Sequence, residues 1–222
     1  MIAGVIALIP AYNEAERIGR VIQQARARVT EVVAIDDGSA DQTSTVAREA
    51  GATVLRHEQN KGKGATILTG LDYFRRSVAE YAILLDADGQ HDPAEIPKFV
   101  EEARRTGAGI VCGTRMEDTK EMPVVRKWTN RFTSWLTGKL ARQPVPDSQC
   151  GYRLVARAVL PDLKLSTVRF ETETEMLIQA GRAGHKIVSV PIRTIYVAGR
   201  NSHIQPCRDT VRFFRLVRKY WP

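Results

Sequence analysis

The sequence predicts an α/β fold with a mostly parallel central sheet flanked by helices, and two observations support this. Short apolar runs alternate with segments whose apolar residues recur every three or four positions, which is typical of strands joined by helical crossovers. Polar turns that contain acidic residues or glycine follow several of these runs, at the strand ends where open parallel sheets bind ligands. The 222 residues suffice for one large domain, so residues 1–222 are predicted to form a single unit.

The apolar runs are assigned to strands. Residues 2–9 form a continuous apolar run, as expected of a central strand covered on both faces. Pro10 and the polar residues after it end this strand. The other runs predict strands at residues 32–35, 53–55, 81–85, 109–112, 187–190 and 192–197.

Helices are predicted between these strands. Ile18, Val21, Ile22 and Ala25 repeat with the spacing of one helical face. Gly51 marks the end of a second helix. The same patterns predict helices at residues 41–50, from the loop 60–64 to about residue 77, after residue 93, and at residues 126–140, 170–183 and 208–221.

Composition restricts the class of protein. The net charge of +8 favours an anionic partner such as a nucleotide, a phospholipid surface, a polyprenyl phosphate or a nucleic acid. No apolar stretch reaches the roughly 18 residues of a membrane span, and the apolar residues 1–9 are too short for a signal peptide. Cys112, Cys150 and Cys207 fit neither a disulfide framework nor a zinc site. We therefore expect reduced thiols in a cytoplasmic protein.

The turn after the predicted strand 81–85 carries two acids. Asp86 and Asp88 are spaced i, i+2, and Gly89 and Pro93 then break regular structure. Two carboxylates at the mouth of a sheet need a counter-charge, and a divalent cation that carries a nucleotide diphosphate would supply one. The alternative is a solvated acidic turn, since Asp-x-Asp is common, but the position after a buried strand favours a ligand site.

The turns after the first two strands are expected to line the same crevice, because parallel strands end at one edge of a sheet. Tyr12 can stack on a base, and Glu14 can accept hydrogen bonds from a ribose or a base. Asp36 or Asp37 can accept from the N–H groups of a base. The alternative for this second turn is a plain turn with a helix cap.

A basic glycine loop opens the third helix. Gly62-Lys63-Gly64 can place backbone N–H groups and a lysine near phosphates. The loop lacks the spacing of a P-loop or of a dinucleotide fold, so a solvated basic loop is the alternative. His91 lies beside the acidic turn and is expected to be structural, because the four histidines show no metal-ligand spacing.

The character of the sequence changes after about Thr114. Residues 1–114 carry most of the acidic and glycine-containing turns, whereas residues 115–204 carry basic residues that can meet an acceptor. Residues 205–222 form a predicted basic helix, which either lies on an anionic membrane surface or packs on the domain. Its basic stripe consists of Arg208, Arg212, Arg215 and Lys219.

Six short segments together form a specific pattern. They are Ile9-Pro10-Ala11-Tyr12-Asn13-Glu14, Asp36-Asp37-Gly38-Ser39-x-Asp41-x-Thr43, Asn60-Lys61-Gly62-Lys63-Gly64, Leu85-Asp86-Ala87-Asp88-Gly89-Gln90-His91-Asp92-Pro93, Gly113-Thr114-Arg115 and Gln149-Cys150-Gly151-Tyr152-Arg153. In this order they resemble family 2 glycosyltransferases, and within that family the dolichyl- or polyprenyl-phosphate sugar synthases. The resemblance implies a GT-A fold, a UDP- or GDP-linked sugar as donor, Mg²⁺ or Mn²⁺ as cofactor, a lipid phosphate as acceptor, and no nucleic acid as partner.

The resemblance also assigns roles to residues. It assigns the metal to Asp86, Asp88 and Gln90, and stabilisation of the departing diphosphate to Asp86, Asp88 and Arg115. Contacts to the nucleotide sugar are implied for Pro10, Tyr12, Glu14, Ile35, Asp36 or Asp37, Lys63, Asp86, Ala87 and Asp88. Contacts to the acceptor are implied for Arg126, Asn130, Gln149, Arg153, Arg200 and Ser202.

The implied reaction is direct displacement at the anomeric carbon with inversion. A lipid phosphate is already largely ionised near neutral pH and needs no general base. A sugar hydroxyl of a cell-envelope glycan, the alternative acceptor, needs a carboxylate base, and the candidates are Asp147, Glu171 and Glu173. Two alternatives lie outside catalysis: a silent regulator that binds sugar nucleotides, and a basic nucleic-acid-binding module, for which no signature is found. The enzyme is expected in the cytoplasm or peripherally on the cytoplasmic face of the membrane.

Overall fold

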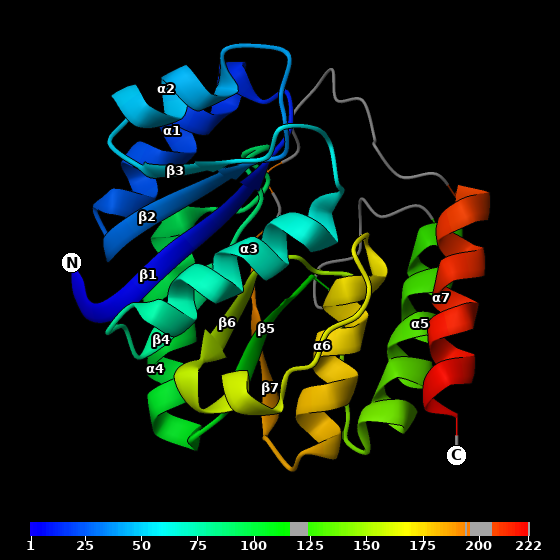
Figure 1. Ribbon diagram of the computed structural model, residues 1–222. Helices are drawn as coiled ribbons and strands as arrows, with labels where there is room; N and C mark the ends of the chain where they lie inside the picture. The colour runs from blue at the N-terminus through cyan, green and yellow to red at the C-terminus, as the bar shows by residue number, and fades with distance from the viewer. Residues whose placement is uncertain (116–123, 194, 196–205, 222) are drawn as a thin grey trace.

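The computed structural model describes residues 1–115, 124–193, 195 and 206–221 (Figure 1). They form a seven-stranded sheet with strand order β3-β2-β1-β4-β6-β5-β7. Neighbouring strands are parallel, except that β6 runs antiparallel to β4 and β5. The strands are β1 (Ile2–Ala11), β2 (Val29–Asp36), β3 (Thr53–Arg56), β4 (Tyr81–Leu84), β5 (Ile110–Thr114), β6 (Arg153–Ala156) and β7 (Ile187–Pro191).

The predicted α/β architecture is confirmed, with two differences among the strands. The antiparallel strand β6 was not predicted, because a buried arginine opens it and a glycine-containing turn precedes it. The predicted strand at 192–197 is not found at Ile192 or Arg193, which follow the end of β7 at Pro191. Residues 194, 196 and 197 lie outside the described residues.

Helices cover both faces of the sheet (Figure 1). Apolar residues of α1, α2 and α4 pack on one face, and those of α3 and α6 pack on the other. Helices α5 and α7 form a further layer against α6, through an apolar cluster that includes Leu136, Ile178 and Leu216. The helices are α1 (Ala15–Arg26), α2 (Thr43–Glu49), α3 (Lys63–Arg76), α4 (Ile96–Thr106), α5 (Val124–Ala141), α6 (Glu171–Arg182) and α7 (Pro206–Tyr220), with short 3₁₀ turns at Pro93–Glu95 and Arg157–Asp162.

The sheet brings the polar turns of the sequence to one edge. Strand β1 pairs in parallel with both β2 and β4, in a register that aligns Ala11 with Asp36 and Leu8 with Leu84. The turns after these three strands therefore emerge side by side. Within the described part of the chain, no helix is both long enough and apolar enough to span a bilayer.

Candidate active site

Reciprocal hydrogen bonds join the turns after β1 and β2. The main-chain N–H of Asn13 donates to Oγ of Ser39 (2.9 Å), and the N–H of Ala40 donates back to Oδ1 of Asn13 (2.9 Å). The N–H of Glu14 donates to Oγ1 of Thr43 at the start of α2 (2.8 Å). Asn13 adopts a left-handed conformation (φ 56°), which asparagine tolerates better than most residues. Together these contacts hold the turns after β1 and β2 against each other.

Asp36 and Asp37 are both buried, and both carboxylates bind other parts of the chain. Asp36 accepts from the N–H of Ser39 (2.8 Å) and from the hydroxyl of Ser44 on α2. Asp37 accepts from the N–H groups of Lys61 (2.9 Å) and Gly62 (2.7 Å). The second aspartate therefore anchors the glycine loop that opens α3.

His57 completes the anchor of this loop. Its Nδ1 lies 2.7 Å from Oδ1 of Asp37, and its Nε2 lies 2.9 Å from the hydroxyl of Thr69 on α3. No feature of the sequence pointed to this histidine, because its partners lie in separate turns and helices. Asp36 and Asp37 thus have structural contacts within the protein. The resemblance also implied that one of them recognises the base. That base-reading role stays a prediction.

The acidic turn after β4 is closely packed. Asp88 is buried, and its Oδ1 accepts from the N–H of Gln90 (3.0 Å). The N–H of Asp86 donates to Nδ1 of His91 (3.2 Å), whose ring stacks on Tyr152 at 5.0 Å between centroids. Burial lowers the pKa of His91 despite the nearby carboxylates, and a neutral ring is the form that can accept this hydrogen bond. His91 therefore has the structural contacts expected of it.

Lys63 connects the glycine loop to the acidic turn. Its Nζ lies 2.6 Å from Oδ1 of Asp86 and 3.4 Å from Oε2 of Glu173 on α6. Burial alone would lower the pKa of Lys63, but the two carboxylates raise it, so the ammonium stays charged. Gly151 lies against this triad: a Cβ there would fall 2.9 Å from Oδ2 of Asp86 and 3.0 Å from Nζ of Lys63.

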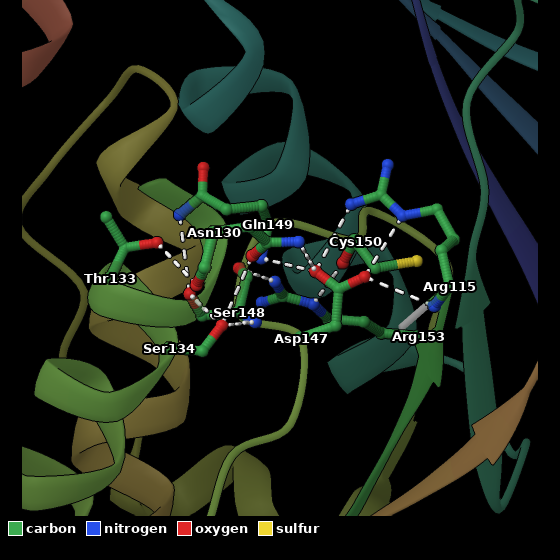
Figure 2. Close-up of polar contacts among 9 residues, drawn as sticks. All are labelled: Arg115, Asn130, Thr133, Ser134, Asp147, Ser148, Gln149, Cys150 and Arg153. Atoms are coloured by element: carbon green, nitrogen blue, oxygen red, sulfur yellow. Dashed lines mark hydrogen bonds and ion pairs between the residues drawn. The ribbon is translucent and has the colours of Figure 1, made fainter. Parts of the chain in front are cut away.

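Arg115 is held by a buried network that Figure 2 shows. Its Nε and Nη2 donate to Oδ2 and Oδ1 of Asp147 at 3.0 and 3.2 Å. Asp147 also accepts from Nδ2 of Asn130 on α5 (3.0 Å) and from the N–H of Gln149 (3.1 Å). Burial favours the neutral form of Asp147, but the hydrogen bonds from Arg115 and Asn130 outweigh it and lower its pKa. Asp147 is thus an ionised partner of Arg115.

Two of the predicted acceptor residues take part in this network, and Arg153 does not face solvent. Asn130 is buried against Asp147, whereas Gln149 is exposed beside it. Arg153 is fully buried, and its Nε and Nη2 donate to the carbonyls of Cys150 (2.8 Å) and Ser148 (2.6 Å). This differs from the acceptor contact that the resemblance implied, because the guanidinium is used to fix the loop before β6.

The remaining predicted residues fall into two groups. Pro10, Tyr12, Glu14 and Ile35 lie at the ends of β1 and β2, with Ala87 and Gln90 in the acidic turn. Arg126 lies in α5, although its side chain is not described, and Arg200 and Ser202 lie outside the described residues. The geometry therefore gathers the predicted donor-side residues at one edge of the sheet, with Arg115 beyond them.

The described residues restrict the chemistry of the site. No group of three or more His, Cys, Asp or Glu side chains among them is arranged to hold a metal by itself. Cys112 and Cys150 are buried free thiols, and burial raises the pKa of Cys112 to about 11 and that of Cys150 to about 12. Neither thiol can supply a thiolate near neutral pH. Carboxylate oxygens and cationic side chains are thus the main reactive groups.

Comparison with known proteins identifies relatives across most of the chain. The sequence matches the model of the family described as Glycosyl transferase family 2 over residues 6–163. The UDP-N-acetylglucosamine–dolichyl-phosphate N-acetylglucosaminyltransferase of Methanococcus voltae is 34% identical over an alignment of 212 residues, and the match covers 85% of this chain and 84% of that protein. Glycosyltransferase AglJ of Haloferax volcanii is 31% identical over 218 residues, which cover 96% of this chain and 70% of that protein.

A solved structure shares the fold. Glucosyl-3-phosphoglycerate synthase from Mycobacterium tuberculosis, in complex with Mn²⁺, uridine diphosphate and phosphoglyceric acid, superposes with a TM-score of 0.70 at 22% sequence identity. The match covers 96% of this chain and 75% of that one. The shared architecture is the GT-A fold, as predicted from the motifs.

Proposed function

Because the chain belongs to glycosyltransferase family 2 and is a glycosyltransferase, we propose that it transfers a sugar from a nucleotide-diphosphate sugar to a polyprenyl-type lipid phosphate. One observation carries the proposal: Lys63 joins Asp86 to Glu173 at the same sheet edge where Asp147 holds Arg115. Acidic groups for a cation and basic groups for phosphates thus lie at one edge of the sheet. The enzyme acts peripherally at the cytoplasmic face of the membrane.

The donor end of the site is suited to a divalent cation. Asp86 and Asp88 offer carboxylate oxygens, the ligands that Mg²⁺ and Mn²⁺ prefer, and a nucleotide diphosphate supplies further oxygens. Gln90 adds an amide oxygen from the same turn. The bound cation would neutralise charge on the departing diphosphate. Nζ of Lys63 lies 2.6 Å from Asp86 and neutralises it. When the donor binds, the cation would replace the ammonium of Lys63 as the counter-charge of Asp86.

Arg115 stabilises the leaving group by electrostatics. Its guanidinium is oriented by two donations to Asp147, so little reorganisation is needed as charge develops on the diphosphate. Tyr12 and Glu14 contact the nucleoside at the entrance between β1 and β2. The acceptor oxygen attacks the anomeric carbon from the face opposite the diphosphate, and the configuration inverts.

The carboxylates near the site favour an acceptor that needs no general base. Asp147 is buried, paired with Arg115 and kept ionised by a lowered pKa, so it is a poor proton acceptor. Glu173 is paired with Lys63. A phosphate monoester is already largely ionised near neutral pH. The dolichyl-phosphate substrate in the name of the Methanococcus voltae relative supports the same acceptor class.

A second candidate acceptor, a sugar hydroxyl of a cell-envelope glycan, is favoured by one observation. Oε2 of Glu171, at the start of α6, is buried and has no hydrogen-bond partner among the described residues. A carboxylate oxygen of this kind can take a proton from a hydroxyl. Replacing Glu171 with glutamine separates the two cases, because only the hydroxyl acceptor requires a base.

A thermal-shift panel followed by a transfer assay tests the proposal. The panel uses UDP, GDP and CDP, each with and without Mn²⁺, since a ligand at 100 times its Kd stabilises a protein by about 2.7 kcal/mol. We expect one nucleotide to raise the midpoint, and more so with Mn²⁺. The matching nucleotide sugar is then supplied with a short polyprenyl phosphate or with a glycan acceptor. A protein indifferent to all three nucleotides under both conditions would refute the proposal.

A further inference from the structure

The outer face of α5 exposes a stripe of large aromatic residues. Trp128, Phe132 and Trp135 are 67%, 50% and 55% exposed. Their i, i+4, i+7 spacing puts them on one side of the helix, and the rings of Phe132 and Trp135 lie 6.1 Å apart. Soluble proteins rarely leave aromatic residues grouped in this way without a partner.

The adjacent helix α7 also exposes large apolar residues. It lies beside α5 (Figure 1), and the two helices pack through Leu136, Leu140 and Leu216. On its exposed side, Phe214 is 49% exposed, and Trp221, directly after the helix, is 57% exposed. All three tryptophans of the chain therefore lie exposed on these two adjacent helical segments.

Cations lie among the aromatic side chains. The guanidinium of Arg131 is 5.9 Å from the ring centre of Trp128, and Nζ of Lys139 is 4.9 Å from that of Trp135. The sequence of α5 contains no acidic residue, and that of α7 contains one. A second copy of the chain would bring like charges together on this face, which disfavours self-association. Aromatic rings with cations beside them match the interface of an anionic bilayer instead.

We propose that this aromatic–basic face of α5 and α7 docks on an anionic lipid bilayer, with the indole rings at the level of the headgroups. Helix α5 presents Asn130 and Ser134 inward to Asp147 and Ser148 while it presents the aromatic stripe outward. Helix α5 therefore lies between the docking face and the Arg115–Asp147 pair. The proposal deepens the proposed function by naming the membrane-binding surface, but its test uses neither donor nor acceptor, so each can fail alone.

Vesicle binding of the full chain tests this directly. Vesicles of phosphatidylcholine alone are compared with vesicles that contain roughly 30% phosphatidylglycerol, and binding is followed by co-sedimentation and by tryptophan emission. We expect co-sedimentation and a shift of the emission maximum to shorter wavelength with the anionic vesicles, both weakened in about 0.5 M salt. Unchanged emission and no co-sedimentation with anionic vesicles would overturn the proposal.

Matched variants locate the binding surface. Serine in place of Trp128, Phe132 and Trp135 together is expected to weaken binding by about tenfold or more, with Trp221 kept as a fluorescent reporter. The control, Val78→Ser with Val168→Ser, removes exposed apolar residues outside this face and is expected to bind as wild type does. Equal binding of the α5 variant and this control would contradict the proposal.

Charge variants separate docking from general attraction. Each cation close to an anionic surface strengthens binding by about fivefold, so R131Q with K139Q is expected to weaken it strongly. R20Q with R48Q removes the same charge from α1 and α2 and is expected to have little effect. Equal losses of binding in the two variants would indicate attraction by net charge alone and would overturn the assignment of this face. A dimer detected by light scattering without vesicles, together with buried-type tryptophan emission, would also overturn it.

Discussion

Arg115 and Asp147 form a two-point ion pair, with separate donations from Nε and Nη2 to the two carboxylate oxygens at 3.0 and 3.2 Å. The arginine directly follows β5 and the aspartate lies in the loop before β6, so the pair joins two segments that are distant in the sequence (Figure 2). A planar guanidinium fits this geometry in a way that an ammonium does not. The orientation of Arg115 therefore depends on Asp147.

Replacing Asp147 with asparagine tests whether it is a positioning residue or a base. We expect the free energy of unfolding to fall by about 3 kcal/mol, because Arg115 loses its buried counter-charge, and kcat to fall with little change in the KM for the donor. The lowered pKa keeps wild-type Asp147 ionised across the neutral range, so the pH profile of the residual activity should keep its shape. Ser134→Ala, which leaves the ion pair intact, is the control, and loss of the acidic limb of the profile would instead indicate a general base.

Replacing Lys63 with methionine tests the exchange of counter-charges. Asp86 and Glu173 then face each other without a cation, and we expect the apo protein to lose about 2 kcal/mol of stability. Mn²⁺ alone should raise the unfolding midpoint of this variant more than that of the wild type, because it no longer competes with the ammonium. Lys61→Met changes an exposed lysine in the same loop and serves as control. Identical responses to Mn²⁺ in all three proteins would contradict the exchange.

The fold and the meeting of the polar turns at one sheet edge could be predicted because both depend on local patterns. The apolar runs that became β1, β2 and β4 and the turns after them are contiguous in the chain, and parallel strands necessarily bring such turns together. Asp86, Asp88 and Lys63 were accordingly singled out. Their partners were harder to predict, since Glu173 lies on α6 and reaches Lys63 only after the chain has folded.

Three further features depended on tertiary contacts. Arg153 was placed at the acceptor by resemblance, whereas burial directs its donors to main-chain carbonyls. Asp37 was considered for base recognition, but its carboxylate also anchors the glycine loop. The basic pattern of α7 is visible in the sequence. The aromatic stripe of α5 is not, because the pattern alone does not distinguish exposed from buried aromatic side chains.

Replacing Asp88 with asparagine tests the metal assignment. We expect the extra stabilisation that Mn²⁺ adds to nucleotide binding to disappear, while metal-free nucleotide binding changes little, because an amide is a weaker ligand for a hard cation. Turnover should fall by about 100-fold or more. Asp92→Asn alters an acid in the same turn that caps the following 3₁₀ turn and is the control. A D88N protein with the Mn²⁺ response of the wild type would rule out this role.

The buried carboxylate of Glu175 predicts a pH dependence of stability. Burial opposes its ionisation, but Lys219, Ser166 and Thr167 donate hydrogen bonds to it and lower its pKa from 4.5 to about 2. A lowered pKa contributes stability above the unfolded-state value, here on the order of 3 kcal/mol, and this is lost as the pH falls from about 4.5 toward 2. In Glu175→Gln, the free energy of unfolding measured by urea denaturation should therefore change less with pH across that range. The exposed Glu49→Gln control should follow the wild type.

Gly151→Ala separates ligand binding from protein stability at the proposed donor site. The new Cβ would lie 2.9 Å from Oδ2 of Asp86 and 3.0 Å from Nζ of Lys63. Both atoms end flexible side chains that can move aside, so we expect a loss of stability below about 1 kcal/mol. The displaced charges no longer match the cation and the diphosphate, so nucleotide affinity with Mn²⁺ should fall by about tenfold or more. The control, Gly19→Ala on α1, adds the same methyl group far from the site. Nucleotide affinity is measured by calorimetric titration for the wild type and both variants. Unchanged affinity in G151A would show that Lys63, Asp86 and Glu173 do not contact the donor.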